Sequence, residues 1–347
     1  MSIRTELRRI VEDRATLSRG EATTLMQRIL ASEVPELELA VLLGAMAGRG
    51  ETAAEIAGFA QTLRALATPL PLSDDERASI VDTCGTGGDN SGTFNISTAA
   101  ALVAAAAGAK VAKHGNRAIT SRCGSADVLE ALGIPTELDP QAAADALRST
   151  GFCFLLAPTH HPAMKTLMPI RRALGVRTVL HVLGPLLNPA GARRQVMGVY
   201  TGRLVAPVAQ AMVLLGTTHG IVVHGHQGID ELALSGGSEV AVVHDESVRL
   251  DTVSPDALQL SKAPLAELAG GDAQANAAIL RAVFTGERGP RRDVVLLNAA
   301  AVLVVAGMSK NLPEGIALAA ETIDSGAVVR LIVRLQGKRS ATAHGRR

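Results

Sequence analysis

The 347-residue chain carries 34 Lys and Arg against 33 Asp and Glu, which leaves a net charge of +1 at pH 7. This balance excludes an overall field for nucleic acid, and an aromatic content of 2% argues against stacking on bases. The length suits one large or two modest domains. The charged N-terminus lacks the apolar segment of a signal peptide, and no apolar run is long enough to span a membrane. We therefore expect a cytoplasmic protein whose three cysteines are reduced thiols.

The first 72 residues are predicted to form helices joined by short turns. Capping boxes at Ser18–Glu21 and Thr52–Glu55 mark two helix starts, and Pro35 is expected at the first helical position of a third. Pro69 and Pro71 then indicate a linker. No residue in this part suggests chemistry, so we interpret it as a packing or oligomer surface.

From Ile80 onward the pattern changes to alternating strands and helices. Strands are expected to end at Ile80-Val81 and to lie at Lys110–Ala112, Phe152–Ala157, Gln195–Val199, Ile221–His224 and Val240–Val243. Helices are expected at Ala99–Ala107, Ser125–Leu132, Pro140–Ser149, Val205–Leu215, Asp293–Ala306 and Glu314–Leu331. This alternation predicts an α/β fold, a mainly parallel sheet flanked by helices with ligands at the carboxyl ends of the strands. A charged helical insertion at about 160–187 interrupts the pattern.

A glycine-rich loop follows the first predicted strand. Gly85, Gly87 and Gly88 come within eight residues of Ile80, and Ser97 and Thr98 stand where the N-cap of the next helix is expected. Backbone N–H groups of such a loop can close on an anion at a helix N-terminus. The alternative is a purely structural turn. The spacing matches neither a P-loop nor a Rossmann fingerprint.

A second polar loop follows the next predicted strand. Lys113, His114, Asn116 and Arg117 form a compact basic cluster there. Because consecutive parallel strands end at the same edge of a sheet, the two loops favour one ligand with more than one phosphate group.

Other polar residues have both a structural and a functional interpretation. His160 and His161 precede a proline, and paired histidines on a loop are commonly solvated. Arg171 would ordinarily be a surface charge on its helix. His224 and His226, near Asp230 and Glu231, could suggest zinc, but alternate strand residues point to opposite faces. The carboxylate pair itself favours a hard cation such as Mg²⁺. The cysteines lack the His–Asn setting of a nucleophile.

Longer motifs resemble one known family. The chain contains G-T-G-G-D with T-F-N-I-S-T, then K-H-G-N-R and G-S-A-D-V-L-E-A-L-G, and later H-P-A-M-K, P-I-R-R-A-L-G-V-R-T, L-G-P-L-L-N-P-A and G-I-D-E. In this content and order the motifs resemble the anthranilate phosphoribosyltransferases of tryptophan biosynthesis. The resemblance covers most of the chain. It implies transfer of a phosphoribosyl group from 5-phosphoribosyl-1-pyrophosphate to the amine of anthranilate, which yields N-(5-phosphoribosyl)anthranilate and pyrophosphate.

The resemblance also assigns roles to residues. It implies that the donor is bound by Gly85, Thr86, Gly87, Gly88, Asp89, Thr93, Asn95, Ser97, Thr98, Lys113, Ser121 and Gly124. The acceptor would lie against Gly85, His114, Asn116, His161, Arg171 and Gly184. Mg²⁺, as two ions with the donor bound, would be held by Ser97, Asp230 and Glu231.

The implied architecture is that of the nucleoside phosphorylases and phosphoribosyltransferases of this fold. A smaller all-helical domain, residues 1–72, would form a homodimer and be joined by the insertion at about 160–187. An α/β donor-binding domain would comprise residues 73–159 and 188–347. Neither nucleic acid nor a membrane is an expected partner.

One departure from the family's pattern is Leu180-His181, where Phe-Asn is common; it bears on the shape of the acceptor pocket.

Two alternative functions remain open from the sequence. A pyrimidine nucleoside phosphorylase of the same fold would carry a K-H-S-G-R-like second loop, whereas this chain has K-H-G-N-R. A catalytically silent relative that binds nucleic acid would need a basic face, which the near-neutral charge disfavours.

Overall fold

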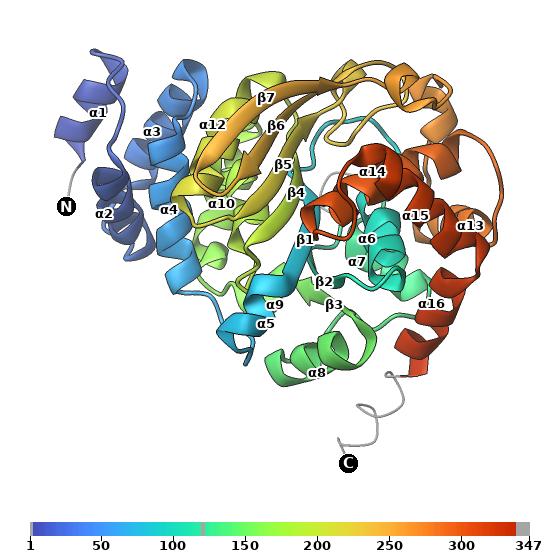
Figure 1. Cartoon of the computed structure of the whole chain (residues 1–347). Helices are drawn as coiled ribbons and strands as arrows, with labels where there is room; N and C mark the ends of the chain where they lie inside the picture. Colours follow the sequence, from blue (N-terminus) through green and yellow to red (C-terminus); the bar gives the residue numbers. More distant parts are fainter. Residues whose placement is uncertain (1–2, 119–121, 338–347) are drawn as a thin grey trace.

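The N-terminal part of the protein is helical. The computed structural model describes residues 3–118 and 122–337 (Figure 1). Its first helices are α1 (Arg4–Val11), α2 (Arg19–Leu30), α3 (Glu36–Arg49) and α4 (Ala53–Ala65). The two predicted capping boxes are present, because Ser18 caps α2 and Thr52 caps α4. Pro35 was expected inside α3 but is its N-cap residue, since its backbone is extended, with ψ at 141°.

One seven-stranded sheet forms the centre of the described chain, in the order β3-β2-β1-β4-β5-β6-β7. The strands in sequence are β1 (Ile80–Gly85), β2 (Lys110–Gly115), β3 (Phe152–Leu156), β4 (Arg194–Gly198), β5 (His219–His224), β6 (Ser238–His244) and β7 (Ser247–Val253). The pairs β3–β2, β2–β1, β1–β4 and β4–β5 are parallel, whereas β5–β6 and β6–β7 are antiparallel, so the predicted mainly parallel sheet is confirmed. Strand β7 was missed, because this edge strand is largely exposed and carries no apolar run.

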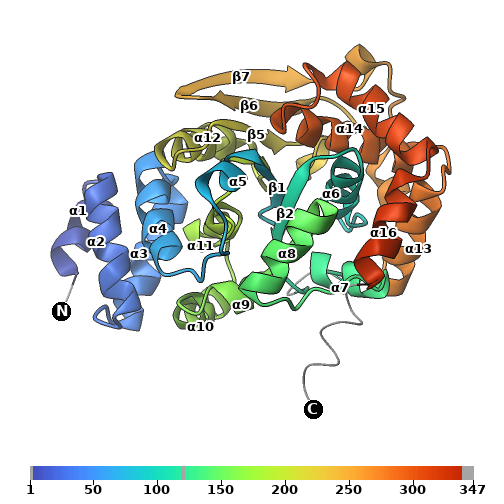
Figure 2. The same cartoon turned by 60° about the horizontal axis from the view of Figure 1, so that its bottom comes forward.

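Helices cover the sheet on both sides (Figures 1 and 2). The helices after α4 are α5 (Asp74–Ser79), α6 (Ile96–Ala106), α7 (Ser125–Ala131), α8 (Pro140–Thr150), α9 (Ala157–His160), α10 (Met164–Leu174), α11 (Val179–Leu183), α12 (Val205–Leu214), α13 (Ala273–Phe284), α14 (Pro290–Val305), α15 (Leu312–Asp324) and α16 (Ala327–Gly337). Short 3₁₀ turns are η1 (Gly184–Leu187), η2 (Gly202–Leu204), η3 (His226–Gly228), η4 (Asp256–Leu258) and η5 (Leu265–Leu268).

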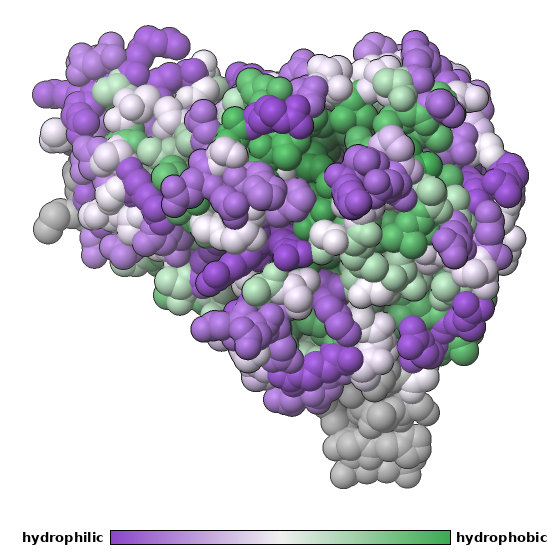
Figure 3. Space-filling model, viewed as in Figure 1, coloured by the Kyte–Doolittle hydropathy of each residue, from purple (hydrophilic) through white to green (hydrophobic). Residues whose placement is uncertain are grey.

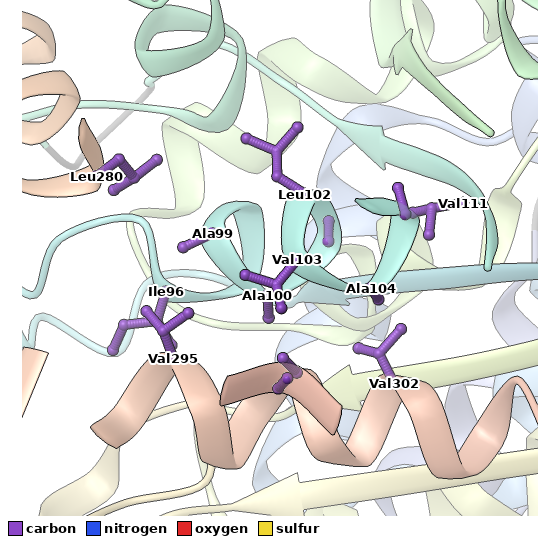
Figure 4. Close-up of a cluster of buried hydrophobic side chains, with 14 of the residues drawn as sticks. Ile96, Ala99, Ala100, Leu102, Val103, Ala104, Val111, Leu280, Val295 and Val302 are labelled. Atoms are coloured by element: carbon purple, nitrogen blue, oxygen red, sulfur yellow. The ribbon is translucent and has the colours of Figure 1, made fainter. Parts of the chain in front are cut away.

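The alanine-rich helix α6 is buried against the long helix α14. In Figure 4, Ile96 and Ala104 of α6 face Val295 and Val302 of α14. Small side chains let the two helices approach closely, and all four residues are buried. This packing fixes the N-terminal end of α6 at the carboxyl end of β1.

The segment around 160–187 returns the chain to the N-terminal helices. Helices α10 and α11 contact α3, and α11 also contacts α4 (Figure 2). Their apolar residues belong to one hydrophobic cluster with the N-terminal helices and one face of the sheet, represented by Phe59, Leu180 and Met197. The helical part is therefore anchored on the sheet through a shared core.

The surface view agrees with this arrangement. In Figure 3, hydrophilic residues predominate over the N-terminal helices, whereas hydrophobic residues gather around a hollow in the middle of the face shown. No helix in the described ranges is long and apolar enough to cross a membrane.

Candidate active site

The glycine loop joins β1 to α6 at the carboxyl edge of the sheet. Gly87 and Gly88 have φ values of +65° and +71°, which glycine adopts without strain. Helix α6 begins at Ile96 with Asn95 as its N-cap residue. The expectation that Ser97 and Thr98 would be the cap was therefore wrong. Both lie in the first turn, because the Asn95 side chain is fixed by Cys123 and Asn276, which brings the chain into the helix earlier.

Asp230 and Glu231 cross to this loop from the turn after β5. The amide of Gly87 donates to Oδ2 of Asp230 at 2.7 Å, and the amide of Ser97 donates to Oε1 of Glu231 at 3.0 Å. A Cβ on Gly85 would lie 2.7 Å from the carboxyl carbon of Asp230. Two motifs more than 130 residues apart in sequence thus share one site.

In the described chain, nearby positive charge does not balance the negative charges of Asp230 and Glu231. Burial, reinforced by Asp89, raises the pKa of Asp230 to about 7. Burial, reinforced by Asp230, raises the pKa of Glu231 to about 8. Among the described residues, the nearby cation is Lys113, whose buried amine donates to the Thr83 carbonyl at 2.6 Å and to the Ser97 hydroxyl at 3.3 Å. These oxygens therefore suit a hard cation, which would favour their ionised forms.

The remaining residues assigned to the donor lie around the same loop. Asp89 accepts hydrogen bonds from the amides of Ser91 and Asp230, and Thr86 accepts one from the amide of Tyr200. The Thr93 hydroxyl is 3.1 Å from that of Ser91. Thr98 is buried, and within the described ranges its hydroxyl forms no hydrogen bond.

The second loop is held by backbone contacts at the start of α7. Gly124 is the N-cap residue of α7 and donates its amide to Asp127 at 2.8 Å. A Cβ at Gly124 would collide with the backbone at Asn116 and Arg117, so this position requires glycine. Ser121 lies outside the described residues.

On the acceptor side, two histidines meet. The rings of His114 and His161 are 5.0 Å apart between centroids in an edge-on arrangement, and both are buried. Burial, and then His161, hold the pKa of His114 well below its ordinary value of 6.5. Burial, and then His160, lower the pKa of His161 to about 4. Both imidazoles are therefore neutral at pH 7 and can line a pocket for a neutral aryl amine.

Arg171 stands near the C-terminal end of α10. Burial lowers its pKa, and no carboxylate in the described part of the chain pairs with it. Asn116 turns its amide oxygen to the Arg117 backbone, and Gly184 begins η1 in open space. No hydrogen bond or ion pair among the described residues joins Arg171 to His114 or His161.

Some neighbours of the site were not found from sequence. The buried carboxylate of Asp82 accepts the amide of His114 at 3.1 Å and thereby fixes the start of the second loop. A charge in an otherwise apolar strand was the available signal. Tyr200 and Arg177 also adjoin the glycine loop.

The residues considered for other chemistry have separate environments. His224 pairs with the Val199 carbonyl and His226 with the Ser235 hydroxyl. Cys84, Cys123 and Cys153 are buried thiols, and burial raises the pKa of each.

The fold and this site define a class of enzyme. Residues 77–329 match the family described as "Glycosyl transferase family, a/b domain", and residues 5–67 match its helical bundle domain. The protein is thus a glycosyltransferase built from these two parts.

Curated and solved relatives narrow the class. The chain is 45% identical over 344 residues to anthranilate phosphoribosyltransferase of Geobacter sp. (strain M21), covering 96% of this chain and 97% of the relative. The enzyme of the same name from Thermus thermophilus superposes with a TM-score of 0.88 at 44% identity, covering 96% of this chain and 98% of that one. The Saccharomyces cerevisiae enzyme, solved with 5-phosphoribosyl-1-pyrophosphate and Mg, superposes with a TM-score of 0.86 at 28% sequence identity, covering 97% of each chain. The chain belongs to the anthranilate phosphoribosyltransferase family, which confirms the resemblance drawn from its motifs.

Proposed function

We propose that this chain carries out its family's reaction with the residues that converge on the glycine loop. In that reaction the phosphoribosyl group of 5-phosphoribosyl-1-pyrophosphate passes to the amine of anthranilate, in the pathway to tryptophan. The observation that carries the proposal is the meeting of Gly87 and Ser97 with Asp230 and Glu231. A glycine loop and helix N-terminus suited to phosphate thus lie beside carboxylates suited to a hard cation.

The donor would be held by the loop from Gly85 to Thr98, with Lys113 beneath it and Gly124 at the second loop. Asp230 and Glu231, with the Ser97 hydroxyl, would hold Mg²⁺, as two ions when the donor is bound. The metal would neutralise the pyrophosphate leaving group. Without a cation, two carboxylates beside a polyanion would repel it. The positive end of the α6 dipole would also favour negative charge on the departing group.

The acceptor would lie near the His114–His161 pair. Arg171, which lacks a carboxylate partner in the described ranges, would bind the carboxylate of anthranilate through its planar fork. Asn116 and Gly184 would complete the pocket. The aryl amine is already neutral at pH 7, so the histidines need not remove a proton before attack. Catalysis would then rest on positioning the amine against C1 of the ribose.

The Leu180-His181 departure acts on the same pocket. Thr178 is the N-cap residue of α11, and its amide donates to Nδ1 of His181 at 3.2 Å. His181 thus caps the helix that precedes Gly184. We propose that this cap sets the pocket's shape and, through it, acceptor preference.

A homodimer is the assembly that we propose. Leu37 and Val41 lie one turn apart on α3 and are 78% and 44% exposed, an apolar face that suits a second copy. Sedimentation at micromolar concentration tests this, and a monomer would contradict it. A cytoplasmic location is also proposed, in keeping with three unpaired thiols.

The function is tested by mixing purified enzyme, anthranilate, 5-phosphoribosyl-1-pyrophosphate and Mg²⁺, and following the loss of anthranilate fluorescence. We expect loss that requires all components. Phosphorolysis of pyrimidine nucleosides by the same preparation, with no loss of anthranilate, would instead favour the phosphorylase alternative.

A further inference from the structure

Arg177 reaches the donor loop from the segment between α10 and α11. Its guanidinium carbon lies 4.6 Å from the centroid of the Tyr200 ring. Its Nε is 3.7 Å from the position that a Cβ on Gly88 would occupy. The guanidinium is therefore next to the glycine at which the loop turns with positive φ.

Tyr200 connects Arg177 to the same loop by a second route. It follows β4, and its amide donates to the Thr86 hydroxyl at 3.1 Å. Its ring is buried and supports Arg177 through a cation–π contact. The guanidinium is thus held in place over the loop without any acidic partner among the described residues.

The charge of Arg177 is not compensated within the described chain. No carboxylate there lies within ion-pair distance of it, although Arg148 and Arg117, for comparison, each pair with glutamates. Lys113, the second cation near the glycine loop, already donates hydrogen bonds to Thr83 and Ser97. A partly buried guanidinium with no carboxylate partner in the described ranges, lying against a glycine turn, is a site for an anion, and its fork matches phosphate oxygens.

We infer that Arg177 is a further donor-binding residue, which contacts a phosphate oxyanion of 5-phosphoribosyl-1-pyrophosphate over Gly88. This inference rests on the proposed function. It also links the two substrates, because Arg177 lies six residues after Arg171 and directly before Thr178, the cap of α11. Donor bound at Arg177 holds the segment that carries the acceptor residue.

The test compares Arg177→Ala with Arg172→Ala, a change of an exposed arginine near the end of α10 that serves as the matched control. Calorimetry measures binding of magnesium pyrophosphate and of ribose 5-phosphate, in the absence of anthranilate. We expect Arg177→Ala to weaken one of the two ligands about 10- to 150-fold, the cost of a lost charge-assisted hydrogen bond, and the control to bind as wild type. The weakened ligand identifies the phosphate that Arg177 contacts. Unchanged affinity for both would overturn the inference.

Two more variants guard against a folding defect. Arg177→Lys keeps the charge but loses the stacked fork, so binding should recover only in part. Tyr200→Leu removes the support, and should weaken the same ligand as Arg177→Ala. Thermal unfolding of each variant confirms that it is folded. A wild-type enzyme that makes no product would refute the proposed function itself, whereas an active wild type with an unaffected Arg177→Ala variant would refute this inference alone.

Discussion

Gly85→Ala would insert a methyl group between the glycine loop and the proposed metal ligand. The new Cβ would lie 2.7 Å from the carboxyl carbon of Asp230. Carbon atoms in comfortable contact are about 3.5–4.0 Å apart, so Asp230 must retreat by roughly 1 Å. That movement breaks the 2.7 Å hydrogen bond from Gly87 and displaces the carboxylate from its place beside Glu231.

The expected loss of activity is large compared with the loss of stability. A displacement of about 1 Å in a positioned group can cost about 100-fold in rate, whereas one extra methyl in a packed site costs about 1–3 kcal/mol of folding free energy. Gly85 has no positive φ, so backbone strain adds nothing to this.

The assay is the initial rate of anthranilate fluorescence loss as a function of Mg²⁺ concentration, with urea unfolding of the same samples. Gly48→Ala is the matched control, because this exposed helical glycine has nothing within 4 Å of its Cβ position. It should keep full activity and gain up to about 1 kcal/mol of stability from helix propensity. A Gly85→Ala enzyme with wild-type kcat and wild-type metal dependence would refute the reasoning.

Three further predictions test other parts of the site. Arg171→Ala should raise KM for anthranilate about 10- to 150-fold and leave that for the donor nearly unchanged, with Lys rescuing poorly; an unchanged acceptor KM would make Arg171 structural. Glu231→Ala should depress kcat far more than urea stability, and EDTA should abolish wild-type activity until Mg²⁺ or Mn²⁺ is restored; activity that survives the chelator contradicts this. Burial lowers the pKa of His181 from 6.5 to about 4. The unfolded chain therefore takes up this proton first, and the free energy of unfolding should fall as pH drops from 6.5 to 4. His181→Asn should make that fall shallower, and an identical slope would count against the assignment.

The main elements of the fold were predictable because their residues carry strong local patterns. Strand β3 is an uninterrupted apolar run, and the capping boxes at Ser18 and Thr52 indicate the starts of α2 and α4. Strand β7 could not be found this way, because backbone pairing with β6 stabilises it and its polar sequence carries no apolar strand pattern. The start of α6 was misplaced since Asn276, 181 residues away from Asn95, helps to fix it.

The candidate site was predictable in pieces but not as an assembly. The glycine-rich loop and the second polar loop could each be identified from their own residues, and the longer motifs indicated the family. The bond between Gly87 and Asp230, however, joins residues 143 apart and exists because β1, β4 and β5 are neighbours in the sheet. The stacking of Arg177 on Tyr200 joins the segment before α11 to the residue after β4, and neither stretch of sequence indicates it alone.

The hydrophobic cluster shared by the N-terminal helices and the sheet bears on how the protein unfolds. Phe59 and Leu42 are fully buried, and they belong to the same apolar cluster as Leu180, Met197 and Val222. Detaching the helices would expose one face of the sheet to water and leave the helices without much of their apolar surroundings. The two parts therefore lack separate stabilities, and the chain should melt in one cooperative transition. A peptide of residues 1–72 alone would then be largely unstructured, even though sequence families divide the protein at that point.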